Sequence, residues 1–138
     1  MKLHSLYTPD IQAECLAFAE AAKPTDNNRE RWLRKSARSL VAFLNEIEPL
    51  PGSEKWVRLS HYQTLSFYAL NVEGLQRQSP QVIVNFRARI CEIRYLLPHE
   101  HRPWVWAQPD ILLDISEAAR LVLDGFTRCE SRPEFLLT

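Results

Sequence analysis

The sequence predicts an all-α fold, a single-domain bundle of about five helices that takes in residues 1–138. Three observations favour it. Only three glycines occur among the 138 residues, which suits helices better than a turn-rich β fold. The hydrophobic fraction of 46% and the charged fraction of 25% are ordinary for one globular domain. Proline-marked breaks separate long segments whose apolar residues recur at helical spacing.

Segment 80–97 is expected to be the central helix of the bundle. Ser79 and Pro80 form a typical helix start, because serine caps free N–H groups and proline suits the first helical position. Spacings of three and four place the apolar residues on one helix side. These residues are Ile83, Phe86, Ile90, Ile93 and Leu97. The segment also exceeds the usual strand length of about 5–6 residues, which favours a helix.

A strand is the alternative for this segment. Apolar and polar residues also alternate from Val82 to Ile90, and the run is rich in β-branched residues. Part of segment 55–72 could also form strands. If 55–72 and 82–95 were both strands, the fold would be α+β.

Four further helices are expected from caps and apolar spacing. Their approximate ranges are 9–22, 26–48, 54–78 and 110–124. The helix over 26–48 is the most clearly amphipathic, with Leu33, Leu40 and Phe43 among the residues of its apolar side.

Charge is distributed unevenly although the formal net charge is zero. Residues 27–102 carry a net charge of +5, whereas residues 1–26 carry −2 and residues 107–138 carry −3. Thirteen of the seventeen basic residues are arginine, whose planar guanidinium makes forked contacts to phosphate and carboxylate groups. A basic middle part of the chain therefore points to an anionic partner.

The basic side of the 26–48 helix is the first candidate site. At helical spacing, its cations fall almost opposite the apolar side. The candidate nucleic-acid-binding residues here are Arg29, Arg31, Arg34, Lys35 and Arg38. Contacts of this kind to phosphates give affinity without reading sequence, so the prediction leaves DNA and RNA open. The alternative is a solvated helix face, supported by a Glu30–Arg34 pair.

Arg87 and Arg94 are two further candidate contacts. They are seven residues apart and would share one edge of a mostly buried helix over 80–97. A buried charge is costly unless it is paired, so they are expected either to pair with Asp114 or Glu117 or to reach an anionic partner.

The long connector 98–108 holds the remaining candidates. Trp104 and Trp106 are candidate interface residues, either as anchors for a partner or as packing against the core. His99, Glu100 and His101 have no metal-binding spacing, so no metal or cofactor is expected. Arg94 followed by His99 or His101 is similar to the loose Arg-x4–6-His spacing of HEPN-type ribonucleases, which implies a metal-independent ribonuclease as a minor alternative.

Composition restricts the location of the chain. The three cysteines, Cys15, Cys91 and Cys129, are far apart without a CxxC pair, so we expect buried thiols in a reducing compartment. No signal peptide and no run near the ~20 apolar residues of a membrane span is visible. These observations predict a cytoplasmic protein without a membrane partner.

The functional prediction is a non-catalytic module that binds nucleic-acid backbone. In size and expected architecture the chain resembles the small helical subunits of ribonucleoprotein machines, such as CRISPR effector small subunits, which implies an accessory subunit of a larger nucleoprotein complex. The alternative is a protein–protein adaptor or inhibitor, for example one encoded by a mobile element, that uses the basic face and tryptophan anchors.

Overall fold

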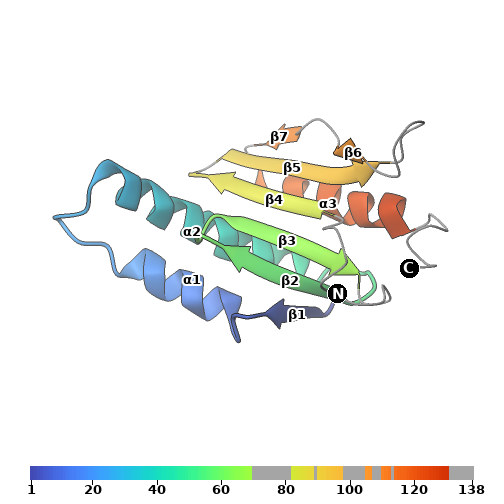
Figure 1. Cartoon of the computed structure of the whole chain (residues 1–138), viewed down its shortest axis with the longest axis horizontal. Helices are drawn as coiled ribbons and strands as arrows, with labels where there is room; N and C mark the ends of the chain where they lie inside the picture. Colours follow the sequence, from blue (N-terminus) through green and yellow to red (C-terminus); the bar gives the residue numbers. More distant parts are fainter. Residues whose placement is uncertain (70–81, 89, 98–104, 107–109, 113, 131–138) are drawn as a thin grey trace.

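The computed structural model shows an α+β fold, with three helices and a mixed sheet in the part of the chain that it describes (Figure 1). It describes residues 1–69, 82–88, 90–97, 105–106, 110–112 and 114–130. The helices are α1 (Ile11–Glu20), α2 (Asn28–Ile47) and α3 (Ile115–Glu130). The main strands are β1 (Leu3–Leu6), β2 (Lys55–Ser60), β3 (Thr64–Ala69), β4 (Val82–Arg87) and β5 (Ile90–Leu97).

The sheet follows the order of the chain from β1 to β5. β1 pairs in parallel with β2, and each of the next three pairs is antiparallel. Two short strands, β6 (Val105–Trp106) and β7 (Asp110–Leu112), pair with different parts of β5. Since β2 to β5 are consecutive antiparallel neighbours, side chains from distant parts of the chain meet in straight rows across the sheet.

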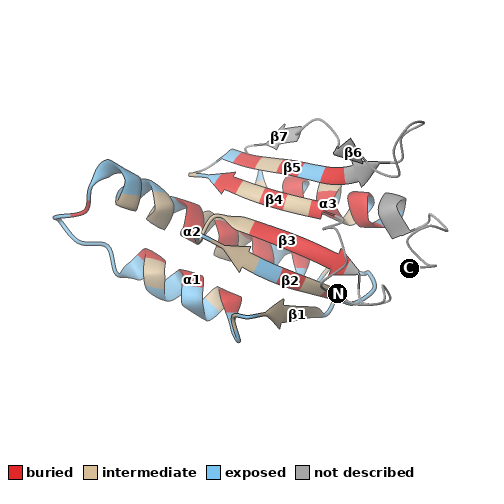
Figure 2. Cartoon of the chain, in the orientation of Figure 1, coloured by how far each residue is buried: buried red, intermediate tan, exposed pale blue. Residues whose placement is uncertain are grey.

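The helices lie on one side of this sheet. Figure 1 shows α2 and α3 behind the strands and α1 beside α2, near β1. The core between them holds fully buried side chains from both layers, shown in red in Figure 2. The largest apolar ones include Phe43 and Leu40 of α2, Phe67 of β3, and Phe86 and Ile93 of the β4–β5 hairpin. No helix in the described residues covers the opposite side of the sheet, which we call the open face.

The predicted all-α bundle is wrong, and the central element shows why. Segment 82–97 is a β-hairpin in which Val82, Val84 and Phe86 are buried, whereas Ile83 and Asn85 are half-buried. The apolar residues of this segment fit a helical period and a period of two equally well. Packing against α2 and α3 selects the strand, because alternate residues can then enter one core. The strand alternative for 82–95 describes the structure.

The predicted helix over 54–78 is wrong for the same reason. Val57 of β2 and Leu65 of β3 face the core, and Arg58 is exposed on the open face. The β2–β3 turn places His61 and Tyr62 at φ of 54° and 57°, a region that non-glycine residues rarely adopt. The Gln63 N–H donates to the Ser60 carbonyl and closes this turn.

Two of the expected helices, over 9–22 and 26–48, are present as α1 and α2, and each has a capped start. Asp10 accepts a hydrogen bond from the Ala13 N–H at the start of α1, and Asn27 accepts one from the Glu30 N–H at the start of α2. Both contacts satisfy N–H groups that have no partner inside their helix. The last helix begins later than predicted, since β7 occupies 110–112 and the Asp114 carboxylate accepts from the Ser116 and Glu117 N–H groups.

The α+β architecture also contradicts the expected resemblance to small helical subunits of ribonucleoprotein machines. The resemblance to small helical subunits depended on a helical bundle, which this chain does not form. Within the part of the chain that the structure describes, no helix is both long and apolar enough to cross a bilayer.

Candidate functional site

The exposed basic side of α2 is the best-formed candidate site. Arg31, Lys35 and Arg38 are all exposed, and we call these three residues the basic ridge. Their spacing on a helix of 3.6 residues per turn puts them on the side opposite the buried residues Ala37 and Leu40. Arg29, in the first turn of α2, is exposed as well.

A groove runs between this ridge and the end of α1. Its volume is about 480 Å³. The residues that line it are Ala19, Ala22, Lys23, Asp26, Arg31, Arg34, Lys35 and Arg38. The groove therefore brings together five cations and one carboxylate, which gives it a net positive charge.

Arg34 differs from the other cations of the groove because it is already bound. Its Nε donates to Asp26 Oδ2 at 2.7 Å, and a second guanidinium nitrogen donates to Oδ1 at 3.3 Å. The two side chains are 13% and 2% exposed. Such a forked pair neutralises Arg34, so this residue is less available to a phosphate than the ridge is.

The ion pair with Arg34 changes the acidity of Asp26. Hydrogen bonding from the Arg34 side chain, and then from the Lys23 N–H, lowers the pKa of Asp26 from 3.8 to about 2, although burial acts in the opposite direction. The carboxylate therefore stays ionised at any ordinary pH, and the pair stays intact.

Arg34 and Arg38 also complete the C-terminal end of α1. The last turn of α1 contains no basic residue, and its carbonyl groups carry the negative end of the helix dipole. Arg34 donates to the Phe18 carbonyl at 2.5 Å, and Arg38 lies 3.5 Å from the Ala19 carbonyl. Two residues predicted as phosphate ligands thus have a structural task, and Arg34 uses all three of its side-chain nitrogens in bonds to Asp26 and the Phe18 carbonyl.

Phe18 lies between Arg34 and the β2–β3 turn. The Arg34 guanidinium carbon lies 4.7 Å from the centre of the Phe18 ring, and Tyr62 stacks on that ring with a centroid separation of 4.0 Å. The Tyr62 hydroxyl donates to Glu14 at 3.2 Å. Burial, and then the bond to Glu14, raises the pKa of Tyr62. These contacts join α1 to α2 and to the β2–β3 turn.

The β4–β5 turn is held against α2 by two serines. Ser36, completely buried, accepts a hydrogen bond from the Ala88 N–H at 2.8 Å and donates to the Trp32 carbonyl at 3.1 Å. Ser39 donates to the Ala88 carbonyl at 2.8 Å. Ala88 has φ of 55°, so this turn is strained for a residue with a side chain. No sequence signal pointed to this contact.

Arg87 and Arg94 lie on strands, and the prediction that they share one edge of a buried helix is wrong. Arg87 ends β4 and donates to Glu92 of β5 at 2.6 Å. Its partner is thus Glu92 rather than Asp114 or Glu117, the two expected acids. Arg94 of β5 is exposed on the open face.

The structure does not test the candidate residues of the connector 98–108. Trp104, His99, Glu100 and His101 lie outside the described residues, and the side chain of Trp106 in β6 is likewise not described. Their predicted roles as interface or ribonuclease residues stay predictions.

The cysteines behave as buried apolar groups where they are described. Cys15 and Cys91 are free and at most 1% exposed, and burial raises the pKa of each thiol to about 12. Such thiols are poor nucleophiles and poor metal ligands. Within the described residues, no group of three or more His, Cys, Asp or Glu side chains could hold a metal ion.

No protein-family model, curated protein or solved structure matches this chain.

Proposed function

We propose that this chain binds the phosphate backbone of a nucleic acid through the basic ridge, without catalysing a reaction there. The observation that supports the proposal is the groove between α1 and α2. Its one carboxylate, Asp26, is paired with Arg34, so Lys23 and the ridge face solvent with no opposing charge among the groove's other lining residues.

The spacing of the ridge suits a chain of phosphates. At a rise of about 1.5 Å per residue, Arg31 and Arg38 are about 10 Å apart along the α2 axis. Phosphates of one duplex strand follow one another at about 3.4 Å along the DNA axis and also wind around it, so a ridge of this length faces about two of them. The contacts would carry no base information, and the affinity would depend strongly on salt.

A salt titration tests the proposal. Labelled single- and double-stranded DNA and RNA are titrated with the protein at several salt concentrations, and the double variant Arg31→Glu with Lys35→Glu is compared with the parent chain. We expect the parent to bind with an affinity that falls steeply with salt, and the variant to lose most of that binding for every sequence. A matched control is Arg58→Glu with Arg120→Glu, which makes the same charge change at exposed positions far from the groove. Equal binding by the parent and the ridge variant would refute the proposal.

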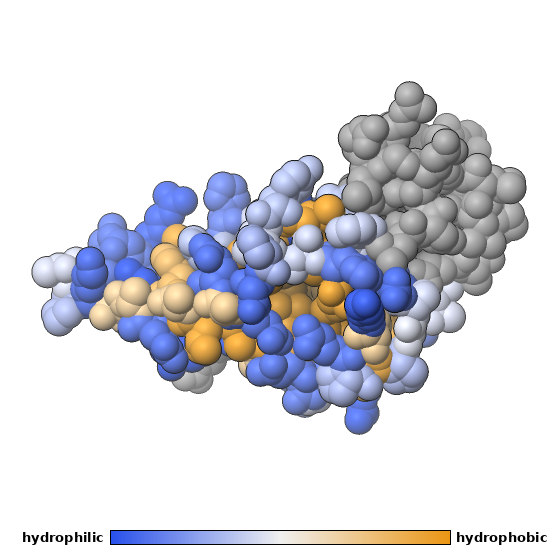
Figure 3. All heavy atoms as spheres, turned by 90° about the horizontal axis from the view of Figure 1, so that it is seen from below, coloured by the Kyte–Doolittle hydropathy of each residue, from blue (hydrophilic) through white to orange (hydrophobic). Residues whose placement is uncertain are grey.

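A protein–protein adaptor is the second candidate function, because α1 has an exposed apolar side. Leu16 is 44% exposed, and Ala13 and Ala17 are exposed beside it. Figure 3 shows apolar side chains on the side of the molecule where α1 and β1 lie. An amphipathic surface helix normally turns such residues inward, so a protein partner would explain them. Absence of nucleic-acid binding even at low salt, with capture of a defined protein partner that Leu16→Glu prevents, would favour the adaptor.

A further inference from the structure

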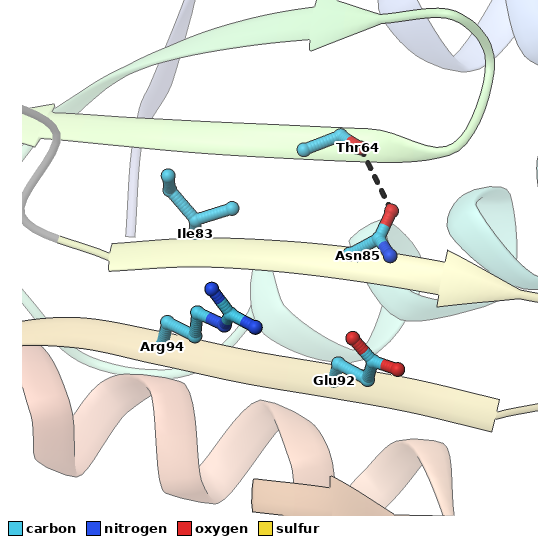
Figure 4. A pocket seen from close by; sticks show the side chains of 5 residues that line it. All are labelled: Thr64, Ile83, Asn85, Glu92 and Arg94. Atoms are coloured by element: carbon cyan, nitrogen blue, oxygen red, sulfur yellow. Dashed lines mark hydrogen bonds between the residues drawn. The ribbon is translucent and has the colours of Figure 1, made fainter. Parts of the chain in front are cut away.

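A second pocket lies on the open face, away from the basic ridge. It has a volume of about 390 Å³, within the range of about 300–1,000 Å³ that is typical of small-ligand pockets. Figure 4 shows its lining side chains on the same side of β3, β4 and β5. They are Thr64, Ile83, Asn85, Glu92 and Arg94.

Three of these residues form a row directly across the strands. Thr64 is opposite Asn85, and Asn85 is opposite Glu92. The Thr64 hydroxyl donates to Asn85 Oδ1 at 2.8 Å, which orients the amide so that its NH₂ group is the part left to a ligand (Figure 4). Glu92 accepts from Arg87 through Oε1, and its side chain is 14% exposed.

The row therefore presents a hydrogen-bond donor beside an acceptor. Among the described residues, neither the Asn85 NH₂ group nor Glu92 Oε2 has a hydrogen-bond partner. A ligand that satisfies both must carry an acceptor beside a donor. A carbonyl next to an N–H group has this pattern.

Arg94 adds a site for a negative group. It lies two residues from Glu92 on the same side of β5, so the two Cα atoms are about 7 Å apart. Its guanidinium has no hydrogen bond and no ion pair with any residue that the structure describes. Ile83, directly opposite Arg94, gives the pocket an apolar wall.

We propose that this pocket binds one nucleotide whose base carries a carbonyl beside a ring N–H, as guanine and uracil do, with its phosphate at Arg94. The base carbonyl accepts from the Asn85 NH₂ group, the ring N–H donates to Glu92, and the ring lies against Ile83. This assignment does not depend on the basic ridge, which lies on the other side of the sheet.

The proposal predicts a measurable preference for guanine and uracil nucleotides over adenine and cytosine nucleotides. Adenine and cytosine present the opposite pattern, an amino donor beside a ring acceptor. With the phosphate at Arg94, their donor would meet the Asn85 NH₂ group and their acceptor would meet the Glu92 carboxylate. If such a base turned over to pair with both groups, its sugar would lie on the Asn85 side, away from Arg94. A mismatch at a charged group weakens binding by about tenfold or more.

Calorimetric titration of the full chain at low salt with GMP, UMP, AMP and CMP tests this selectivity. We expect GMP and UMP to bind at least about tenfold more tightly than AMP and CMP, and guanosine to bind about tenfold more weakly than GMP because it lacks the phosphate. Equal affinity for the four nucleotides, or no binding of GMP, would overturn the proposal.

Variants then assign the binding to the pocket. Arg94→Gln is expected to reduce GMP affinity to that of guanosine, and Glu92→Gln to remove the preference over AMP. Circular dichroism checks that Glu92→Gln, which loses the pair with Arg87, remains folded. Arg94 is exposed and unpaired among the described residues, so its replacement does not threaten folding. If Arg31→Glu with Lys35→Glu abolished GMP binding while Arg94→Gln left it unchanged, the nucleotide would belong to the ridge and this proposal would fall.

Discussion

The guanidinium of Arg34 binds both carboxylate oxygens of Asp26, eight residues earlier in the chain. This pair closes the loop between α1 and α2 and separates the cations of α2 into two kinds. Arg34 supports the structure, whereas Arg31 and Lys35 leave their charges to solvent. The distinction leads to two predictions.

The first prediction concerns the pH dependence of stability. The pKa of Asp26 is lowered from 3.8 to about 2, so the folded state binds this proton less readily than the unfolded state does. The stabilisation is therefore fully present above about pH 4 and is lost as the pH falls through 4 toward 2. Thermal unfolding of the parent and of Asp26→Asn should show a difference in Tm that shrinks over this range. A difference that stayed constant from pH 7 to pH 2 would contradict the assignment.

The second prediction uses Arg34 and Lys35 as a matched pair, since each variant removes one positive charge from the same helix. Arg34→Gln should lower Tm, because it leaves the Asp26 carboxylate without its partner. Lys35→Gln should leave Tm nearly unchanged but reduce the slope of log affinity against log salt by about 0.7–0.9, the value for one phosphate contact. The measurements are thermal unfolding and the nucleic-acid salt titration. The reverse outcome, with Lys35 controlling Tm, would show that the roles are misassigned.

The contact between Ser36 and Ala88 gives a third prediction. Ser36→Ala removes the acceptor of the Ala88 N–H in a completely buried position. A donor left unsatisfied beside the completely buried Ser36 position costs about 1–3 kcal/mol, and because Ala88 itself is half-buried, urea unfolding should show a loss near the lower end of that range. Ser39→Ala is a useful comparison, because Ser39 is half-buried and water can replace its bond to the Ala88 carbonyl. Equal losses in both variants would indicate that burial does not set the cost.

The fourth prediction concerns the strained conformation of Ala88 itself. A residue with a side chain costs about 1–2 kcal/mol in the left-handed region, whereas glycine costs about 0.5–1 kcal/mol in unfolded-chain entropy. Since Ala88 has φ of 55°, Ala88→Gly should raise the free energy of unfolding by up to about 1 kcal/mol. Ala17→Gly, at an exposed position inside α1, is the control, and it should destabilise the chain by about 1 kcal/mol. A loss of stability in both variants would argue against the strained turn.

The sequence by itself determined α1 and α2. Asp10 and Asn27 cap them through neighbours three residues away, and the apolar period of α2 decides which side is buried. The exposure of Arg31, Lys35 and Arg38 follows from that same period. These features depend on interactions within one or two helical turns, so they can be predicted locally.

Only the tertiary structure decided the state of segment 82–97. Its apolar residues fit a helix and a strand equally, and the choice depends on pairing with β3, which comes from a distant part of the chain. The candidate site shows the same division. That Arg34 is bound to Asp26 depends on the path of the α1–α2 loop. That Asn85 and Glu92 lie side by side depends on the register of the β4–β5 hairpin. The local sequence determines the spacing of apolar residues and the charge of each side chain. Which residue each side chain contacts depends on packing between segments that are far apart in the sequence.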